Sequence, residues 1–349
     1  MPYMKTSVFV VIPNVNGGSD LPGVIEAVLA QSHKDLTLVV VDNGSIDNSR
    51  SVIESYQQKD KRVRGIYLDK NYGFTGGTNA GLELAIQENA RYVAGCNNDA
   101  LPHKDWLKHL VAFLDTHPTY GSAACKLLHA DGKTFDSTGD QYTIWGLSFP
   151  RGRDKPTSNR YDDQTELFGA SGGASMYRVS MLKKIGLFDQ DFFAYYEDID
   201  LSFRAQLAGY KIGFVPQSLV YHEQGKTSKR MVSGFTTYQT IKNLPWVALK
   251  NLPWSCLRRV LPRFALAYGL FVASAFSRGQ GWMALKGLTT STALLPKKLL
   301  QRRAIQRSRT VSNHYIWNIL LHDLPPNAHK LRILRDKWHR LRGRKQNSA

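Results

Sequence analysis

Residues 95–99, GCNND, place one carboxylate, Asp99, and two amides, Asn97 and Asn98, directly after an apolar run. A nucleoside diphosphate carries several negative charges, and it leaves more readily when a hard divalent cation with oxygen ligands balances them. Because Mg²⁺ keeps several waters, one protein carboxylate together with phosphate oxygens can hold it. The motif therefore indicates either a metal–diphosphate site or an ordinary solvated turn at the end of a strand.

A second acidic cluster, Glu197, Asp198 and Asp200, lies within the stretch YYEDIDLSFR. Neighbouring carboxylates raise one another's pKa, so one of them can act as a general base near neutral pH. The alternative is a helix N-terminus, where acidic side chains interact favourably with the helix dipole. His222 follows a strand-like run, and a single histidine of this kind is interpreted as structural unless a cation lies nearby.

Two glycine-containing stretches could contact a nucleotide. Asp42 ends an apolar run just before Gly44, and its carboxylate could accept a base imide N–H or a ribose hydroxyl, or form an Asx turn. The stretch NYGFTGGTNAG, residues 71–81, exposes backbone around Gly73 before an expected helix. A helix N-terminus of this kind favours anions, although turn chemistry alone also explains a glycine-rich loop.

The elements that would position these residues alternate along the first hundred residues. Apolar, strand-like runs occupy residues 7–13, 36–42, 63–69 and 91–96, and helical spacing occupies 20–32, 45–58 and 76–89. Strands that are apolar throughout and separated by helices predict a parallel sheet covered on both faces. In such sheets ligands bind beyond the carboxyl ends of the strands. The polar residues expected there are Asn14, Asn16, Asp42, Asn43, Asn71, Asn98 and Asp99.

Charge is distributed unevenly over the 349 residues. The net charge is +18, but residues 226–349 hold 24 Lys and Arg against only two acidic residues, whereas residues 1–225 are slightly acidic. This asymmetry predicts an anionic partner surface, either lipid or nucleic acid, for the C-terminal third. The three cysteines are widely spaced, which excludes a disulfide framework and favours a reducing compartment.

The C-terminal third has the character of a membrane-surface segment. It repeats the element NLPW at 243–246 and 251–254, and its longest uncharged apolar stretch, residues 264–276, is thirteen residues long. That stretch is shorter than the roughly 20 residues that a spanning helix needs. Arg, Lys and Trp around it suit a helix lying in the membrane interface, and residues 331–341 predict a second basic amphipathic helix.

Six motifs in order make the chain resemble the family 2 glycosyltransferases of GT-A fold, most closely their rhamnosyltransferase-like branch. The resemblance covers roughly residues 7–230 and rests on VVIPNVN, VVVDNGSIDNS, NYGFTGGTNAG, CNND, the stretch around YYEDIDLSFR, and VYHEQGKTS. It implies a Rossmann-like, mostly parallel central sheet with flanking helices in a catalytic domain of residues 1–230. Residues 231–349 are then expected to form a basic, helical, membrane-associating extension.

The resemblance also implies roles for individual residues. Asp198 would be the catalytic base and Glu197 would orient the donor sugar or the acceptor, while Asp99 and His222 would be ligands of Mg²⁺ or Mn²⁺. The donor pocket would be lined by Pro13, Asn14, Asn16, Asp42, Asn71, Gly73, Asn79, Asn98, Gly172 and Gly173. Two departures from the family pattern concern this pocket: Val15 replaces a frequent Tyr, and Asn97–Asn98 replaces a more acidic pair, which puts the dependence on metal in question.

The expected activity is an inverting transfer of a sugar, with rhamnose as one candidate, from a dTDP- or UDP-linked donor to a lipid-linked or glycan acceptor hydroxyl. The expected location is peripheral, at the cytoplasmic face of the membrane. One alternative is a nucleotidyltransferase, but the stretch PNVNGGSD lacks a phosphate-gripping basic residue. The other is a non-enzymatic polyanion-binding protein, although the Trp and Leu between the basic residues favour lipid over nucleic acid.

Overall fold

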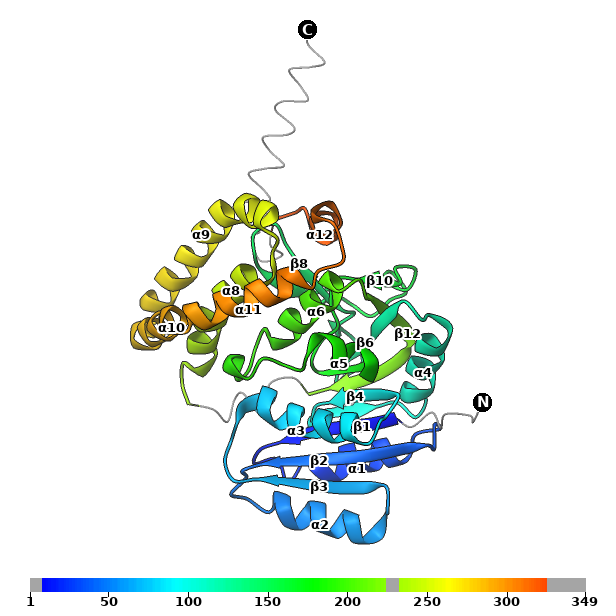
Figure 1. Ribbon diagram of the computed structural model, residues 1–349. Coiled ribbons are helices and arrows are strands. Elements are labelled where there is room, and N and C mark those ends of the chain that lie inside the picture. The colour runs from blue at the N-terminus through cyan, green and yellow to red at the C-terminus, as the bar shows by residue number, and fades with distance from the viewer. Residues whose placement is uncertain (1–7, 224–231, 325–349) are drawn as a thin grey trace.

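The computed structural model describes residues 8–223 and 232–324. Its centre is a mixed sheet with the strand order β10-β12-β6-β11-β4-β1-β2-β3, and helices lie on both of its faces (Figure 1). The mostly parallel sheet with flanking helices that the sequence predicts is confirmed. Two further strands of this sheet, β5 and β7, lie off this path and pair with β12 and β6.

The parallel part of the sheet is built from apolar runs that end in polar residues. It contains β1 (Val8–Asn14), β2 (Leu36–Asn43), β3 (Val63–Leu68) and β4 (Tyr92–Cys96). β1 pairs in parallel with both β2 and β4, and the register sets Asn14 beside Asp42 at the carboxyl ends. The polar ends of neighbouring strands therefore meet at one edge of the sheet.

The other part of the sheet begins with an antiparallel strand. β11 (Ala174–Arg178) runs antiparallel between β4 and β6 (Tyr120–His129), and β12 (Lys211–His222) is parallel to β6. The short strands of this part are β5 (Ala100–Pro102), β7 (Phe135–Ser137) and β10 (Glu166–Leu167), while β8 (Asp140–Tyr142) and β9 (Ser148–Pro150) form a separate hairpin. β12 brings His222 to the edge where β4 ends, because His222 pairs with Ala100.

Alternate side chains of each strand point to opposite faces and form two cores. Val8, Val10 and Ile12 pack on one face, whereas Phe9 and Val11 pack on the other. The first face is covered by α1 (Leu21–Leu29), α2 (Ser49–Lys59) and α4 (Trp106–Thr116). The second is covered by α3 (Gly73–Gln87), α5 (Val179–Ile185) and α6 (Glu197–Leu207). The first turns of α3 and α6 thereby come to the same edge as the strand ends.

A helical extension follows the sheet, as predicted. It consists of α8 (Phe235–Asn251), α9 (Trp254–Ser277), α10 (Gly281–Ala293), α11 (Leu295–Arg307) and α12 (Asn313–Ile319) (Figure 1). Buried residues of α8 and α9, such as Trp246 and Val260, share a third core with Phe203 of α6. The predicted boundary between residues 230 and 231 falls within residues 224–231, which the structure does not describe, and it stays a prediction.

The end of the described chain returns to the small hairpin. The N–H of Ile144 donates to the carbonyl of Leu321 over 3.1 Å, and the N–H of Leu321 donates to the carbonyl of Tyr142 over 2.8 Å. Leu321 therefore pairs with the hairpin of β8 and β9, although it lies far from that hairpin in the sequence.

Helix α9 is longer than the apolar stretch that predicted it. The uncharged residues 264–276 lie inside a helix of 24 residues that is long and apolar enough, by length and composition alone, to cross a membrane. Only 17% of its most apolar window is buried within the protein. The other predicted amphipathic helix, at residues 331–341, lies outside the described residues.

Candidate active site

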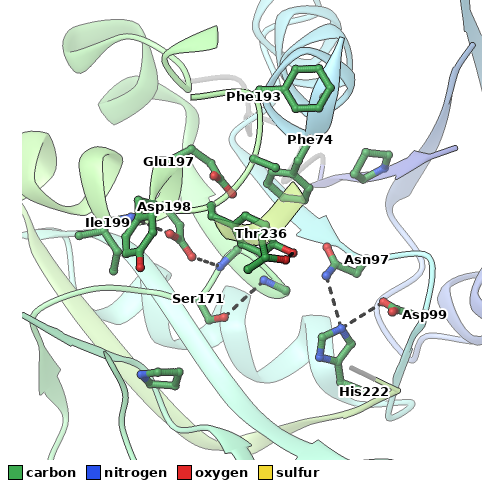
Figure 2. Close-up of a pocket in the computed structure, with 18 of the residues that line it drawn as sticks. Phe74, Asn97, Asp99, Ser171, Phe193, Glu197, Asp198, Ile199, His222 and Thr236 are labelled. Atoms are coloured by element: carbon green, nitrogen blue, oxygen red, sulfur yellow. Dashed lines mark hydrogen bonds and ion pairs between the residues drawn. The ribbon is translucent and has the colours of Figure 1, made fainter. Parts of the chain in front are cut away.

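A cavity of about 740 Å³ lies at the carboxyl ends of the parallel strands (Figure 2). Both Asp99, after β4, and Asp198, in the first turn of α6, line it. The other predicted site residues that line it are Pro13, Asn14, Asn71, Gly73, Asn98, Gly172, Gly173, Glu197 and His222. The structure thus brings most of the predicted residues into one space.

Three predicted donor-binding residues lie beside the cavity, and they form contacts within the protein. The carboxylate of Asp42 accepts a hydrogen bond from the N–H of Ser45, three residues on, over 3.1 Å. Asn16 accepts from the N–H of Ile46 over 2.8 Å. The amide of Asn79 binds both backbone groups of Phe188, over 2.8 and 3.1 Å. In this structure, Asn79 therefore connects α3 to the segment after α5.

Asp99 and His222 meet on one side of the cavity. His222 Nε2 lies 3.1 Å from Asp99 Oδ1 and 3.4 Å from Asn97 Nδ2 (Figure 2). His222 Nδ1 lies 2.7 Å from Asp136 Oδ2. Asp136 in turn pairs with Arg153 over 2.7 Å. Burial disfavours the charged imidazole, but the hydrogen bonds with Asp136 and Asp99 outweigh it and raise the pKa of His222 to about 9.

These side chains fit a divalent cation. In an octahedral Mg²⁺ shell with bonds of about 2.1 Å, adjacent ligand atoms lie about 3 Å apart, as His222 Nε2 and Asp99 Oδ1 do. The carboxylate on Nδ1 resembles the partner that metal-binding histidines usually have. Among residues 8–223 and 232–324, no group of three or more His, Cys, Asp or Glu side chains could hold a metal ion, so phosphate oxygens and water would complete the shell.

Three carboxyl groups gather on another side of the cavity. Asp198 accepts hydrogen bonds from the N–H of Gly172 over 2.9 Å and of Ile199 over 2.8 Å. Burial raises the pKa of Asp198, and these N–H groups partly offset that rise. Burial and then the charge of Asp198 raise the pKa of Glu197 and of Asp140 well above the ordinary carboxyl values. Within the described structure, Glu197 Oε2 and Asp140 Oδ2 are buried without a hydrogen-bond partner.

The first turn of α3 forms the wall between these two sides and is held by amides. Asn43 Nδ2 donates to the carbonyl of Gly73 over 2.8 Å, and Asn43 Oδ1 accepts from the N–H of Tyr72 over 2.9 Å. Asn71 accepts from the N–H of Gly73 over 2.8 Å. Gly73 has φ +77°, and a Cβ there would lie 2.4 Å from the carbonyl oxygen of Phe193. This glycine therefore allows α3 to approach the segment that precedes Asp198.

The sequence reasoning missed Asp136, Asp140 and Arg153, which all line the cavity. They come from residues 129–153, a region that reads as polar hairpins and loops. The pair of acids spaced four apart, each in a Ser-, Thr- and Gly-rich stretch, is the only sequence feature that could have pointed to them.

A sequence profile described as "Glycosyl transferase family 2" matches residues 9–186. TuaG of Bacillus subtilis, named for teichuronic acid biosynthesis, is 30% identical over 137 residues, which cover 39% of this chain and 53% of TuaG. A GalNAc(5)-diNAcBac-PP-undecaprenol beta-1,3-glucosyltransferase of Campylobacter jejuni is 35% identical over 81 residues, 23% of this chain and 26% of that enzyme. The matched segments thus span about half or less of these relatives.

Solved structures share the GT-A fold with this chain. Staphylococcus aureus TarS, residues 1–349 in complex with UDP-GlcNAc, aligns over 86% of this chain and 91% of its own, with a TM-score of 0.55 and 18% identity. The mannosyltransferase PcManGT of Pyrobaculum calidifontis, in complex with GDP-Man and Mn²⁺, aligns over 91% and 89%, with a TM-score of 0.52 and 17% identity. These alignments cover the C-terminal helices as well as the sheet.

Proposed function

Because the chain belongs to glycosyl transferase family 2, we propose that it transfers a sugar, with inversion, from a nucleoside diphosphate to an acceptor hydroxyl at a membrane surface. The observation that carries this proposal is the single cavity lined by both Asp99 with His222 and Asp198 with Glu197. A leaving diphosphate and an attacking hydroxyl need groups of this kind on opposite sides of the sugar.

Asp198 takes the role of the base in this proposal. Its carboxylate is oriented by two backbone N–H groups, so an oxygen can accept the proton of an acceptor hydroxyl as that hydroxyl attacks the anomeric carbon. Burial raises the pKa of Asp198 toward the operating pH, and a general base is most effective when its pKa lies near that pH. Glu197, whose Oε2 is unpartnered, is proposed to accept a hydrogen bond from a sugar hydroxyl.

Asp99 and His222 would hold a divalent cation at the diphosphate. When bound, such a cation supplies balancing charge for the departing phosphates. Asp136 keeps the His222 ring oriented so that Nε2 faces Asp99. The Mn²⁺ in the PcManGT complex supports a cation in this fold.

The donor is proposed to be a dTDP- or UDP-linked sugar, with rhamnose as one candidate. The N-terminus of α3 at Gly73 lines the cavity and suits the diphosphate, because the positive end of the helix dipole favours anions. Pro13, Asn14 and Asn98 line the cavity and are proposed to contact the nucleoside, with Asp42 and Asn16 supporting them. UDP-GlcNAc and GDP-Man in the two fold neighbours support a nucleotide-sugar donor.

The acceptor is proposed to be lipid-linked and reached from the cytoplasmic face of the membrane. Large apolar side chains are exposed on α9, α10 and α11, among them Leu266, Leu270 and Trp282, which is 72% exposed. Arg258, Arg263 and other exposed basic residues lie on the same helices, and such a mixture suits an anionic bilayer surface. The PP-undecaprenol in the name of the Campylobacter relative supports an acceptor of this class.

The proposal is tested by incubating the purified chain with a panel of dTDP-, UDP- and GDP-sugars, Mg²⁺ or Mn²⁺, and a bacterial lipid extract. Release of nucleoside diphosphate together with sugar incorporation into lipid is the expected result. Release of pyrophosphate with incorporation of a nucleotide would instead identify a nucleotidyltransferase. Salt-sensitive DNA retention without release from any donor would identify a polyanion-binding protein.

A further inference from the structure

The segment that leads into Asp198 has a backbone conformation that bulky residues avoid. Phe193, Tyr195 and Tyr196 have φ of 64°, 68° and 73°, in the left-handed region that favours glycine. Three such residues within four positions persist only where the surrounding structure imposes the conformation. Phe193, Tyr195 and Tyr196 also line the cavity, so whatever imposes this conformation also shapes the candidate active site.

Several of the contacts that hold this segment come from α8. Asn243 Nδ2 lies 3.0, 2.9 and 2.8 Å from the carbonyl oxygens of Phe192, Ala194 and Tyr195. Lys242 Nζ donates to the carbonyl of Phe192 over 3.2 Å and to that of Asp191 over 2.9 Å. The carbonyl groups before Asp198 therefore converge on two neighbouring side chains of one helix.

A second pair of side chains on α8 binds Asp200, which follows Asp198, and its lysine also reaches Asp189, which precedes this segment. Asn251 Nδ2 donates to Asp200 Oδ1 over 2.8 Å. Lys250 Nζ lies 2.9 Å from Asp200 Oδ1 and 2.5 Å from Asp189 Oδ2. Asp200 is completely buried, so its charge depends on these partners together with Arg204, whose Nε lies 2.9 Å from Asp200 Oδ2.

The two pairs belong to the repeat that the sequence shows. Its two copies read KNLPW at residues 242–246 and 250–254, and the eight-residue offset is a little more than two helical turns. Lys242, Asn243, Lys250 and Asn251 are each at most 4% exposed. The first copy thus places a buried Lys–Asn pair against the chain before Glu197–Asp198, and the second places one against Asp200 after them, with Lys250 also bridging to Asp189.

We infer that the two Lys–Asn pairs of the KNLPW repeat are positioning residues for the base, which fix the segment 191–200 from both sides so that Asp198 faces the acceptor. None of the four is among the described residues that line the cavity, so their effect on the reaction passes through this segment. The inference rests on the proposed function, because it takes Asp198 as the base.

The first measurement does not depend on activity. Backbone hydrogen exchange of Asn243→Ala is compared with that of the wild type and of Thr237→Val. Thr237 is a matched control because it is buried on the same helix and bonds Gln280, away from segment 191–200. We expect faster exchange at residues 191–200 in Asn243→Ala alone, with strands β1 to β4 unchanged.

The second measurement is a double-mutant cycle on turnover. Asn243→Ala is expected to lower kcat by up to about 10²-fold, as a small misplacement of a reacting group can, with the affinity for UDP and Mn²⁺ within threefold of wild type. In the Asp198→Asn background, Asn243→Ala should cause no further loss, because the group it positions is already disabled. Independent losses that multiply would show that Asn243 acts elsewhere and would overturn the inference.

The outcomes separate this inference from the proposed function. If Asp198→Asn keeps wild-type turnover, the base assignment fails, whereas the exchange data still decide whether α8 fixes segment 191–200. If Asp198→Asn is inactive but Asn243→Ala changes neither exchange nor kcat, the positioning role is wrong. If Asn243→Ala does not fold, Lys242→Met and Asn251→Ala take its place in both measurements with the same expected results.

Discussion

At the scale of single residues, replacing Asp198 should impair turnover more specifically than replacing any other side chain of the site. We expect Asp198→Asn to reduce kcat by roughly 10²–10⁴-fold, because a positioned general base contributes about that factor. The amide keeps the shape of the carboxylate but can accept from only one of the Gly172 and Ile199 N–H groups, so the melting temperature should fall while UDP affinity stays near that of wild type. Steady-state kinetics with calorimetric UDP titration check this, and near-normal turnover would contradict the assignment.

The pH dependence should follow from the environment of the same carboxyl. Burial raises the pKa of Asp198, so the base is protonated and activity is lost as pH falls through a value above the usual 3.9 or so. The charge of Arg153 lowers the pKa of Asp198. Arg153→Met should therefore move the acid limb of the kcat profile to higher pH, whereas Arg160→Met, at an exposed position, should leave it in place. An acid limb that moves down in Arg153→Met would contradict this electrostatic account.

Asp136 should matter through His222. It is buried and lies 2.7 Å from His222 Nδ1, and loss of such a partner typically weakens metal binding 10–100-fold. We expect Asp136→Asn to lower Mn²⁺ affinity by about that factor, measured by electron paramagnetic resonance in the presence of UDP. Asp162→Asn, which removes the partly exposed partner of Lys126, is the control. Equal Mn²⁺ affinity in both variants would exclude a role for Asp136 in holding the ion.

At the scale of elements, the approach of α3 to the segment before α6 depends on Gly73. Gly73→Ala combines a left-handed φ, which costs an L-residue about 1–2 kcal/mol, with a Cβ only 2.4 Å from the Phe193 carbonyl oxygen. Gly279→Ala is a matched control, because Gly279 has φ +72° but open space around its Cβ. Both variants should lose stability in denaturant titrations, and only Gly73→Ala should also lose roughly 10–10²-fold in turnover. Equal turnover in the two would show that this contact does not shape the site.

The strands of the parallel half-sheet could be predicted because the residues that define each strand are consecutive in the sequence. β1, β2 and β4 are continuous apolar runs that end in Asn14, Asp42 and the GCNND stretch, and parallel topology then places these ends together. Asp198 and His222 came from a resemblance in motif order. Neither route could find Asp136 or Asp140, because their place in the site depends on short strands that pair with distant segments.

The burial of lysines in the C-terminal helices is also something that the sequence could not predict. The net charge of +22 over residues 226–349 predicts that the lysines and asparagines of this segment lie at the protein surface, in contact with water or with anionic lipid headgroups. Lys250 and Lys298 are nevertheless buried, because Asp189, Asp191 and Asp200 of the catalytic segment pair with them. Such complementarity between residues 50 to 109 positions apart is invisible to composition and periodicity.

At the scale of the whole molecule, the exposed face of α9 is expected to set membrane affinity. Leu266 and Leu270 lie one helical turn apart and are 57% and 61% exposed. Burying one leucine in an apolar phase contributes roughly 1.5–3 kcal/mol, so Leu266→Glu with Leu270→Glu should lower partition onto anionic liposomes at least about tenfold. Flotation measures this, with Ile46→Glu as the control at an exposed site on a loop. Unchanged flotation of the double variant would place the lipid contact elsewhere.

The pairing of Leu321 with Tyr142 and Ile144 has a practical consequence for anyone who wants a shortened enzyme. Cutting the chain before α8 would remove the helices whose buried side chains form much of the third core. Cutting it just before Leu321 would remove the hydrogen-bonding partner of the hairpin that begins at Asp140. A more soluble version is better obtained by substituting polar side chains for the exposed apolar ones on α9 and α10.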